Sequence, residues 1–128
     1  MEKLDFEFFK PLAQDHGENP RHRGALEIFN GHASLKGDCG DSMKMWVFVQ
    51  DGRVVGASFD TDGCGASRAA GSMAACLARG LTVEEAARLR QIDILNALGG
   101  LPEESEHCAF LAAETLNRAC RDYLKTQP

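Results

Sequence analysis

The feature that most constrains this fold is a pair of strand-like segments joined by a two-residue turn. Met43 to Gln50 is rich in β-branched and aromatic residues, and a second segment runs from about Arg53 to Thr61. Asp51-Gly52, which separates them, is a strong signal for a β-hairpin. Because a hairpin fixes two strands side by side, the middle of the chain must form an antiparallel sheet.

A third segment extends this sheet. Ala25 to Leu35 carries scattered apolar residues and is interpreted as a first strand or hairpin, so residues 25–61 predict a three-stranded antiparallel sheet. In the last strand Val55, Ala57 and Phe59 alternate with polar residues. Side chains two residues apart lie on one face of a strand, so these three are expected to share a face, opposite Ser58 and Asp60.

The pattern after Ala66 is helical. Small residues favour a helix over 66–79, a capping box that begins at Thr82 opens a helix to about Arg90, and further helices are expected over 92–98 and 107–125. An N-terminal stretch from Phe6 has roughly helical spacing and ends at Asn19-Pro20. Strands followed by helices predict an α+β fold, a three-stranded antiparallel sheet packed against several helices, as a single domain over residues 1–128.

Composition limits the function. The chain is 44% hydrophobic, as expected of a globular domain, and its formal charge of −5 argues against a nucleic-acid partner. The first residues lack a basic and then apolar leader, and no apolar run approaches the ~20 residues of a membrane span. We therefore expect no membrane partner and a cytoplasmic location. In that compartment an odd count of five cysteines indicates metal binding or sulfur chemistry rather than disulfides.

Three of the cysteines stand in polar or glycine-rich surroundings. Cys39 and Asp41 share the loop 36–41, Cys64 lies between two glycines where a strand gives way to a helix, and His107-Cys108 opens the last helix. Together these residues supply three thiols, a carboxylate and an imidazole, one more donor than a four-coordinate ion needs. The surplus indicates a soft-metal site built to exchange ligands.

Each of these positions also has a plainer interpretation. Cys39 would then be an incidental thiol in an exposed turn, Cys64 a small buried residue at a tight turn, and His107 a capping or surface histidine. Neighbours at a helix start point in different directions, so His107 and Cys108 are expected to bind one ion in turn rather than together. Cys76 and Cys120 fall among apolar residues and are predicted to lie in the core, whereas His16, His22 and His32 are predicted to lie at the surface.

The chain resembles the IscU/NifU N-terminal family of iron–sulfur cluster assembly scaffolds over nearly its whole length. The matching segments are Asp15-His16 through Asn19-Pro20-Arg21, Cys39 through Lys44, Phe59 through Ser67, and Glu106-His107-Cys108. By that resemblance the fold is α+β with a three-stranded sheet, and Cys39, Asp41, Cys64, His107 and Cys108 are ligands of a cluster or metal. The histidine and the lack of an insertion place the chain nearer the IscU type than the zinc-containing SufU type.

The resemblance implies a scaffold that is not itself a catalyst. It receives sulfur from a cysteine desulfurase, assembles a transient [2Fe–2S] cluster with iron, and passes the cluster to apo-proteins. Cys108, which follows the polar run 103–107, is the predicted sulfur acceptor. Scaffolds served by a dedicated Hsp70 chaperone carry Leu-Pro-Pro-Val-Lys before the His-Cys pair. Here Leu101-Pro102 is followed by Glu103-Glu104-Ser105, which puts chaperone-assisted release in doubt.

Two other functions fit the same residues. Zinc would accept the three thiols with Asp41 or His107, so a zinc-binding domain, structural or sulfur-accepting, is the main alternative, and zinc is a plausible occupant of the isolated protein. A hydrolase or transferase with Cys64 as nucleophile and His107 as base would leave the other two cysteines unexplained.

Overall fold

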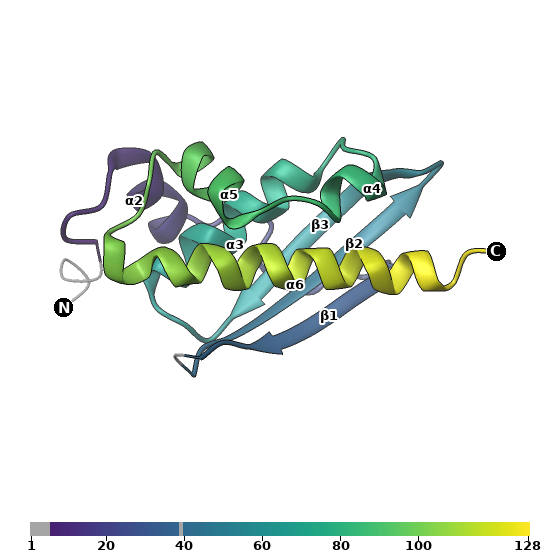
Figure 1. Cartoon of the computed structure of the whole chain (residues 1–128), viewed down its shortest axis with the longest axis horizontal. Helices are drawn as coiled ribbons and strands as arrows, with labels where there is room; N and C mark the ends of the chain where they lie inside the picture. The colour runs from purple at the N-terminus through teal and green to yellow at the C-terminus, as the bar shows by residue number, and fades with distance from the viewer. Residues whose placement is uncertain (1–5, 39) are drawn as a thin grey trace.

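The computed structural model describes residues 6–38 and 40–128, which form an α+β fold (Figure 1). The elements follow in the order α2 (Pro11–Glu18), β1 (Gly31–Lys36), β2 (Ser42–Gln50), β3 (Arg53–Thr61), α3 (Gly65–Ala78), α4 (Val83–Ala86), α5 (Gln91–Leu98), a 3₁₀ turn η1 (Glu103–Ser105) and α6 (Glu106–Lys125). The predicted fold class, with strands in the first half and most helices in the second, is confirmed.

The sheet is antiparallel with strand order β1-β2-β3. At the turn between β2 and β3, Asp51 and Gly52 have φ values of 54° and 78°. Two positive φ values are the mark of a type I′ turn, whose twist matches that of the flanking strands, so the predicted hairpin is confirmed. The pairing runs back to Met43 opposite Thr61, which brings the beginning of β2 beside the end of β3.

The sheet differs from the sequence-based expectation at two places. β1 begins only at Gly31, because the Asn30 side chain occupies the next pairing position: it donates to the Val49 carbonyl and accepts from the Val49 N–H, both at 2.8 Å. The second difference is Val55, which was expected to share a face with Ala57 and Phe59 but is 45% exposed, whereas Ala57 and Phe59 are fully buried. The register shifts there, with Phe48 opposite Gly56 and Val49 opposite Val54, and this bulge turns Val55 outward.

Helices α3 and α6 lie along one face of the sheet, α3 against β3 and α6 across β1 and β2 (Figure 1). Gly71 allows the close approach of α3, because a side chain there would collide with the ring of Phe59, which is fully buried. Alanines fill much of the interface, and their small side chains allow the two layers to approach closely. α5 packs against both α3 and α6, and α2 packs against α3.

The shorter helices refine the predicted bounds. The Thr82 capping box is present, with Glu85 N–H donating to Thr82 Oγ1 and Thr82 N–H donating to Glu85 Oε1. This helix was expected to reach about Arg90 but ends at Ala86, because Arg90 is already the N-cap of α5. α2 begins at Pro11 rather than near Phe6, as proline is favoured in a first helical turn.

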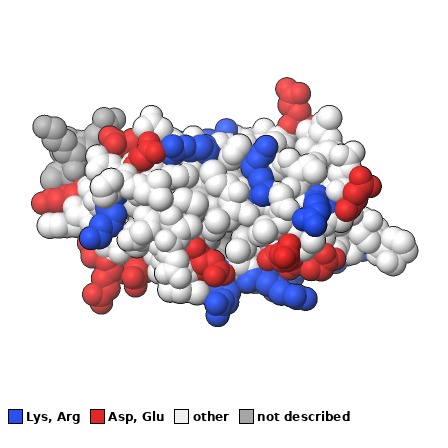
Figure 2. All heavy atoms as spheres, turned by 90° about the horizontal axis from the view of Figure 1, so that it is seen from above, with Lys and Arg blue, Asp and Glu red and all other residues white. Residues whose placement is uncertain are grey.

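Figure 2 draws the charged side chains of one face of the molecule. Acidic and basic side chains alternate on the face shown in Figure 2, rather than gathering into one basic field as nucleic-acid binding requires. Among the described helices, none combines the length and the apolar character that crossing a bilayer demands.

Candidate metal centre

Three of the predicted ligands meet at one end of the sheet. The ligand atoms of Asp41, Cys64 and Cys108 all lie within 4.8 Å of one another. Asp41 immediately precedes β2, Cys64 is the N-cap of α3 just after β3, and Cys108 lies in the first turn of α6. Ligands held 2.0–2.3 Å from one zinc ion stand about 3.5 Å apart, so small side-chain adjustments bring these three onto one ion.

Ser67 lies at the centre of this group. Its side chain is fully buried, and its hydroxyl donates to Asp41 Oδ2 at 3.0 Å and stands 3.5 Å from Cys108 Sγ. Because a hydroxyl has one proton, Ser67 donates to the carboxylate or to the sulfur but not to both at once. Gly63 leaves the room for this arrangement, since a side chain there would collide with both Ser67 and the Asp41 carboxylate.

Cys64 is the accessible thiol of the group. Its side chain is exposed at the start of α3, and its pKa is lowered to about 5. The neighbouring Cys108 thiol makes the largest contribution, and the backbone N–H groups of Ser67 and Ala66 stabilise the thiolate further. Partial burial and the Asp41 carboxylate act in the opposite direction. At neutral pH Cys64 is therefore a thiolate, the form that binds metal and attacks sulfur.

Cys108 and His107 differ in their surroundings. Cys108 is 2% exposed and lies against Ser67 of α3, whereas His107 is exposed. The two side chains do not diverge as expected, since His107 Nε2 stands 3.7 Å from Cys108 Sγ. His107 nevertheless lies outside the set whose ligand atoms all approach one another. It therefore stands beside the group, next to Cys108, rather than within it.

Cys39, the remaining predicted ligand, lies outside the described residues. Its neighbours in the loop are described: Gly37 N–H donates to the Asp41 carbonyl at 2.8 Å, and Gly40 has a φ of 94°. The loop therefore closes on itself from 37 to 41 with a glycine in a conformation that other residues avoid. The ligand role of Cys39 remains a prediction.

The other cysteines and histidines mostly follow their predicted places. Cys120 is fully buried, and burial raises its pKa to about 12. Cys76 is only partly buried, packed against the edge of the core. His22 is exposed and His32 is partly so. His16, predicted at the surface, is instead 6% exposed, because it lies between α2 and α3 with Nδ1 2.7 Å from Ser72 Oγ. That expectation was wrong because α2 turns its His16 face toward α3.

Two residues of the site escaped the sequence analysis. Ser67 follows Cys64 by three positions, so it lies one helical turn along α3 and faces the same site. Thr61, 7% exposed, binds backbone groups beside both Asp41 and Cys64, as described below. The helical spacing was a usable signal for Ser67. Thr61 lies within the matched segment Phe59 through Ser67, but its place in a strand gives no sign of the hydrogen bonds that it makes.

The fold and the site define a small α+β domain that presents thiols and a carboxylate at one end of its sheet. The family model of the NifU-like N-terminal domain matches residues 9–128. The chain belongs to this family.

Relatives of known name extend the comparison. An iron–sulfur cluster assembly scaffold protein IscU of Archaeoglobus fulgidus is 41% identical over 112 residues, which covers 87% of this chain and 73% of that protein. The IscU scaffold of Aquifex aeolicus is 36% identical over 127 residues, covering 97% of this chain and 80% of the relative.

Solved structures share the fold. The N-terminal part of a NifU-like protein from Brucella abortus superposes with a TM-score of 0.73 at 17% identity, over 99% of this chain and all of that one. A putative SUF-system scaffold from Fervidobacterium islandicum gives a TM-score of 0.72 at 18% identity, over 90% of this chain and 98% of the other. At this identity the likeness supports the fold alone.

Proposed function

We propose that this protein is a scaffold on which a labile [2Fe–2S] cluster is assembled and from which it is transferred to apo-proteins. The observation that carries the proposal is the convergence of Asp41, Cys64 and Cys108 at an open end of the sheet. Relatives that bear the name of iron–sulfur cluster assembly scaffold, and that align over most of this chain, support it.

The proposed ligand set is Cys39, Asp41, Cys64, His107 and Cys108. Permanent [2Fe–2S] sites commonly use four thiolates, and this chain offers three. The set is completed by a carboxylate, a hard donor poorly matched to a sulfide-bridged iron, or by an imidazole. The protein offers five donors where the cluster has four positions to fill, so one protein ligand can replace another. A cluster held in this way is suited to release rather than to storage.

Sulfur delivery requires an acceptor thiol. A cysteine desulfurase carries its sulfur as a persulfide; attack by an acceptor thiolate moves the outer sulfur across and leaves the desulfurase thiolate behind. Two electrons from a reductant must then convert that sulfur to sulfide. Cys108 remains our predicted acceptor, whereas the exposure and low pKa of Cys64 favour Cys64 as the thiol that meets the partner first.

The acceptor is identified by mass spectrometry after incubation with a desulfurase and cysteine. With Cys108 as the acceptor, the persulfide adduct disappears in Cys108→Ser and survives in Cys64→Ser. The reverse result assigns the role to Cys64, and an adduct that survives both substitutions contradicts a sulfur-accepting thiol in this pair.

The remaining elements of the proposal follow from the scaffold role. Its partners are a desulfurase that supplies sulfur and apo-proteins that receive the cluster, and it works in the cytoplasm as one domain without catalysing a reaction of its own. The acidic residues Glu103 and Glu104 lie in η1, just before α6, in place of the second proline and the lysine of the chaperone motif. This departure argues against release assisted by a dedicated Hsp70.

A zinc-binding domain is the second candidate, because a carboxylate and two thiols at this spacing also suit a tetrahedral zinc ion. A Cys64–His107 catalytic pair has less support: among the described hydrogen bonds, His107 contacts Cys108 and not Cys64.

The deciding experiment is anaerobic reconstitution with iron, cysteine and a desulfurase, followed by mixing with an apo-ferredoxin. A scaffold builds a visible cluster and transfers it faster than free iron and sulfide load the ferredoxin. A stripped and reduced protein that builds no cluster but binds zinc tightly contradicts the scaffold and establishes the zinc domain.

A further inference from the structure

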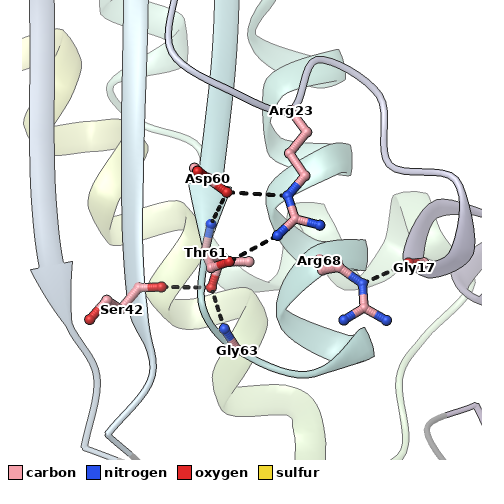
Figure 3. A network of polar contacts seen from close by, with 7 residues as sticks. All are labelled: Gly17, Arg23, Ser42, Asp60, Thr61, Gly63 and Arg68. Carbon is pink, nitrogen blue, oxygen red and sulfur yellow. Dashed lines mark hydrogen bonds and ion pairs between the residues drawn. The ribbon is translucent and has the colours of Figure 1, made fainter. Parts of the chain in front are cut away.

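One hydroxyl group connects the two loops that carry Asp41 and Cys64. Thr61 Oγ1 donates to the Ser42 carbonyl at 2.6 Å and accepts from the Gly63 N–H at 3.0 Å (Figure 3). Ser42 directly follows Asp41, and Gly63 directly precedes Cys64. A hydroxyl has one proton to give and accepts readily, so both hydrogen bonds form at the same time. We call this pair of hydrogen bonds the Thr61 bridge.

The Thr61 bridge lies at the end of the backbone pairing between β2 and β3. Met43 opposite Thr61 is the last pair of the β2–β3 ladder on this side. Beyond it, side chains replace the ladder: Thr61 holds the carbonyl of Ser42, and Asp62 Oδ1 accepts from the Ser42 N–H at 2.8 Å. Both backbone groups of the residue after Asp41 are thus held by the segment that leads into Cys64.

Thr61 itself is held independently of its hydroxyl. Arg23 Nη2 donates to the Thr61 carbonyl at 3.2 Å, and the Thr61 N–H donates to Asp60 Oδ1, which Arg23 Nε also contacts at 3.2 Å (Figure 3). These contacts involve only the backbone of Thr61. A substitution that removes the hydroxyl and keeps the β-branched shape therefore leaves the end of β3 in place while cutting the bridge.

We propose that Thr61 is a positioning residue, which sets the separation of the Asp41 and Cys64 loops through its hydroxyl and thereby the affinity of the site for a metal ion. The proposal rests on the proposed function only for the ligand roles of Asp41 and Cys64. Groups that orient ligands typically contribute 10–100-fold to metal affinity. The other hydrogen bond between these loops, from the Ser42 N–H to Asp62 Oδ1, does not involve the Thr61 hydroxyl, so a substitution at Thr61 tests the bridge separately from it.

The test compares Thr61→Val, which loses the hydroxyl at nearly constant shape, with Thr61→Ser, which keeps it. The matched control is Thr115→Val, since Thr115 is a fully buried threonine whose Oγ1 donates to the Leu111 carbonyl at 2.7 Å within α6. The first measurement is the affinity of each reduced, metal-free protein for Co²⁺ alone, read from the absorption of the cobalt–thiolate bond. Thr61→Val is expected to lose about tenfold or more in affinity, with Thr61→Ser and Thr115→Val near the starting protein.

The second measurement is amide hydrogen exchange of the metal-free proteins. Thr61→Val is expected to speed exchange at Gly63, whose N–H donates to Thr61, and also at Gly37, whose N–H donates to the Asp41 carbonyl. Faster exchange at Gly37 is the sign of coupling, because Thr61 does not touch that residue. Exchange in the middle of α6 reports whether the variant is folded.

The outcomes separate this proposal from the proposed function. Unchanged Co²⁺ affinity in Thr61→Val, an equal loss in Thr115→Val, or faster exchange confined to Gly63 would each overturn it. A starting protein that binds Co²⁺ but builds no cluster contradicts the scaffold function. The role of the Thr61 bridge is then still decided by the Co²⁺ affinities of the variants. If the starting protein binds no Co²⁺, exchange at Gly37 alone decides.

Discussion

Two cysteines, one at the beginning of α3 and one in the second half of α6, differ in exposure and in the direction of their pKa shift. Cys64 lies at the first of these places, exposed, with its pKa lowered to about 5, whereas Cys120 lies at the second, fully buried, with its pKa raised to about 12. Cys64 is surrounded by another thiol and by backbone N–H groups, and Cys120 by apolar side chains that disfavour charge. The surroundings of Cys64 thus favour the reactive thiolate, whereas the apolar core around Cys120 keeps that thiol protonated.

The largest expected effect is a difference in alkylation. At pH 7 the thiolate fractions of Cys64 and Cys120 differ by about 10⁵, and the weaker nucleophilicity of a low-pKa thiolate offsets about 10³ of that. Cys64 of the metal-free protein should therefore react with iodoacetamide ~100-fold faster or more, since burial protects Cys120 further. Below about pH 5 protonation slows Cys64. Peptide mass spectrometry measures both rates, and comparable labelling of the two cysteines would contradict the comparison.

A matched pair of truncations separates metal binding from stability. Cys64→Ala is expected to lower zinc affinity 10-fold or more while leaving the free energy of unfolding nearly unchanged, because the side chain is exposed. Cys120→Ala is expected to leave zinc affinity unchanged and to cost about 1 kcal/mol, through the loss of buried contacts. Zinc competition titrations and urea unfolding measure the two quantities. Equal effects of the two variants on zinc affinity would show that the site extends into the core.

The carboxylate gives the next effect. Asp41→Ala removes the hard donor from the proposed set and is expected to lengthen the lifetime of a reconstituted cluster in air, by a few-fold. Absorbance decay measures that lifetime. Ser67→Ala is the control, because it removes the hydrogen bond to Asp41 while keeping the carboxylate. An unchanged or shorter lifetime in Asp41→Ala would show that the carboxylate does not make the cluster labile.

The smallest effect concerns a buried group away from the site. Burial, and then the nearby Arg21 charge, lower the pKa of His16 below its ordinary value of 6.5. The unfolded chain therefore binds this proton first as pH falls, so the contribution to stability is complete above about pH 6.5 and decreases as pH falls toward the folded-state pKa. His16→Gln should reduce the loss of urea resistance between pH 7 and 5 without changing zinc affinity. An identical pH profile in the two proteins would refute this role.

Much of the fold could be predicted locally. The Asp51-Gly52 turn, the strands on either side of it and the Thr82 capping box depend on residues within a few positions of one another, and all are present. Val55 could not be placed, because the bulge that turns it outward arises from the pairing of two strands. His16 could not be placed either, since its burial depends on how α2 docks on α3.

The residues of the site also divide into those that local sequence could place and those that it could not. The hairpin brings Asp41 and Cys64 near each other, because each lies just beyond the far end of one of its two paired strands. The sequence by itself therefore determined the α+β class, the hairpin and this pair of ligand loops, through short-range turn geometry and hydrophobic pattern. Only the tertiary structure decided that Cys108 is buried against Ser67, that His107 stands at its edge and that Cys64 stays exposed. Those positions depend on how α6 packs across the sheet, a long-range balance of side-chain contacts that no local segment specifies.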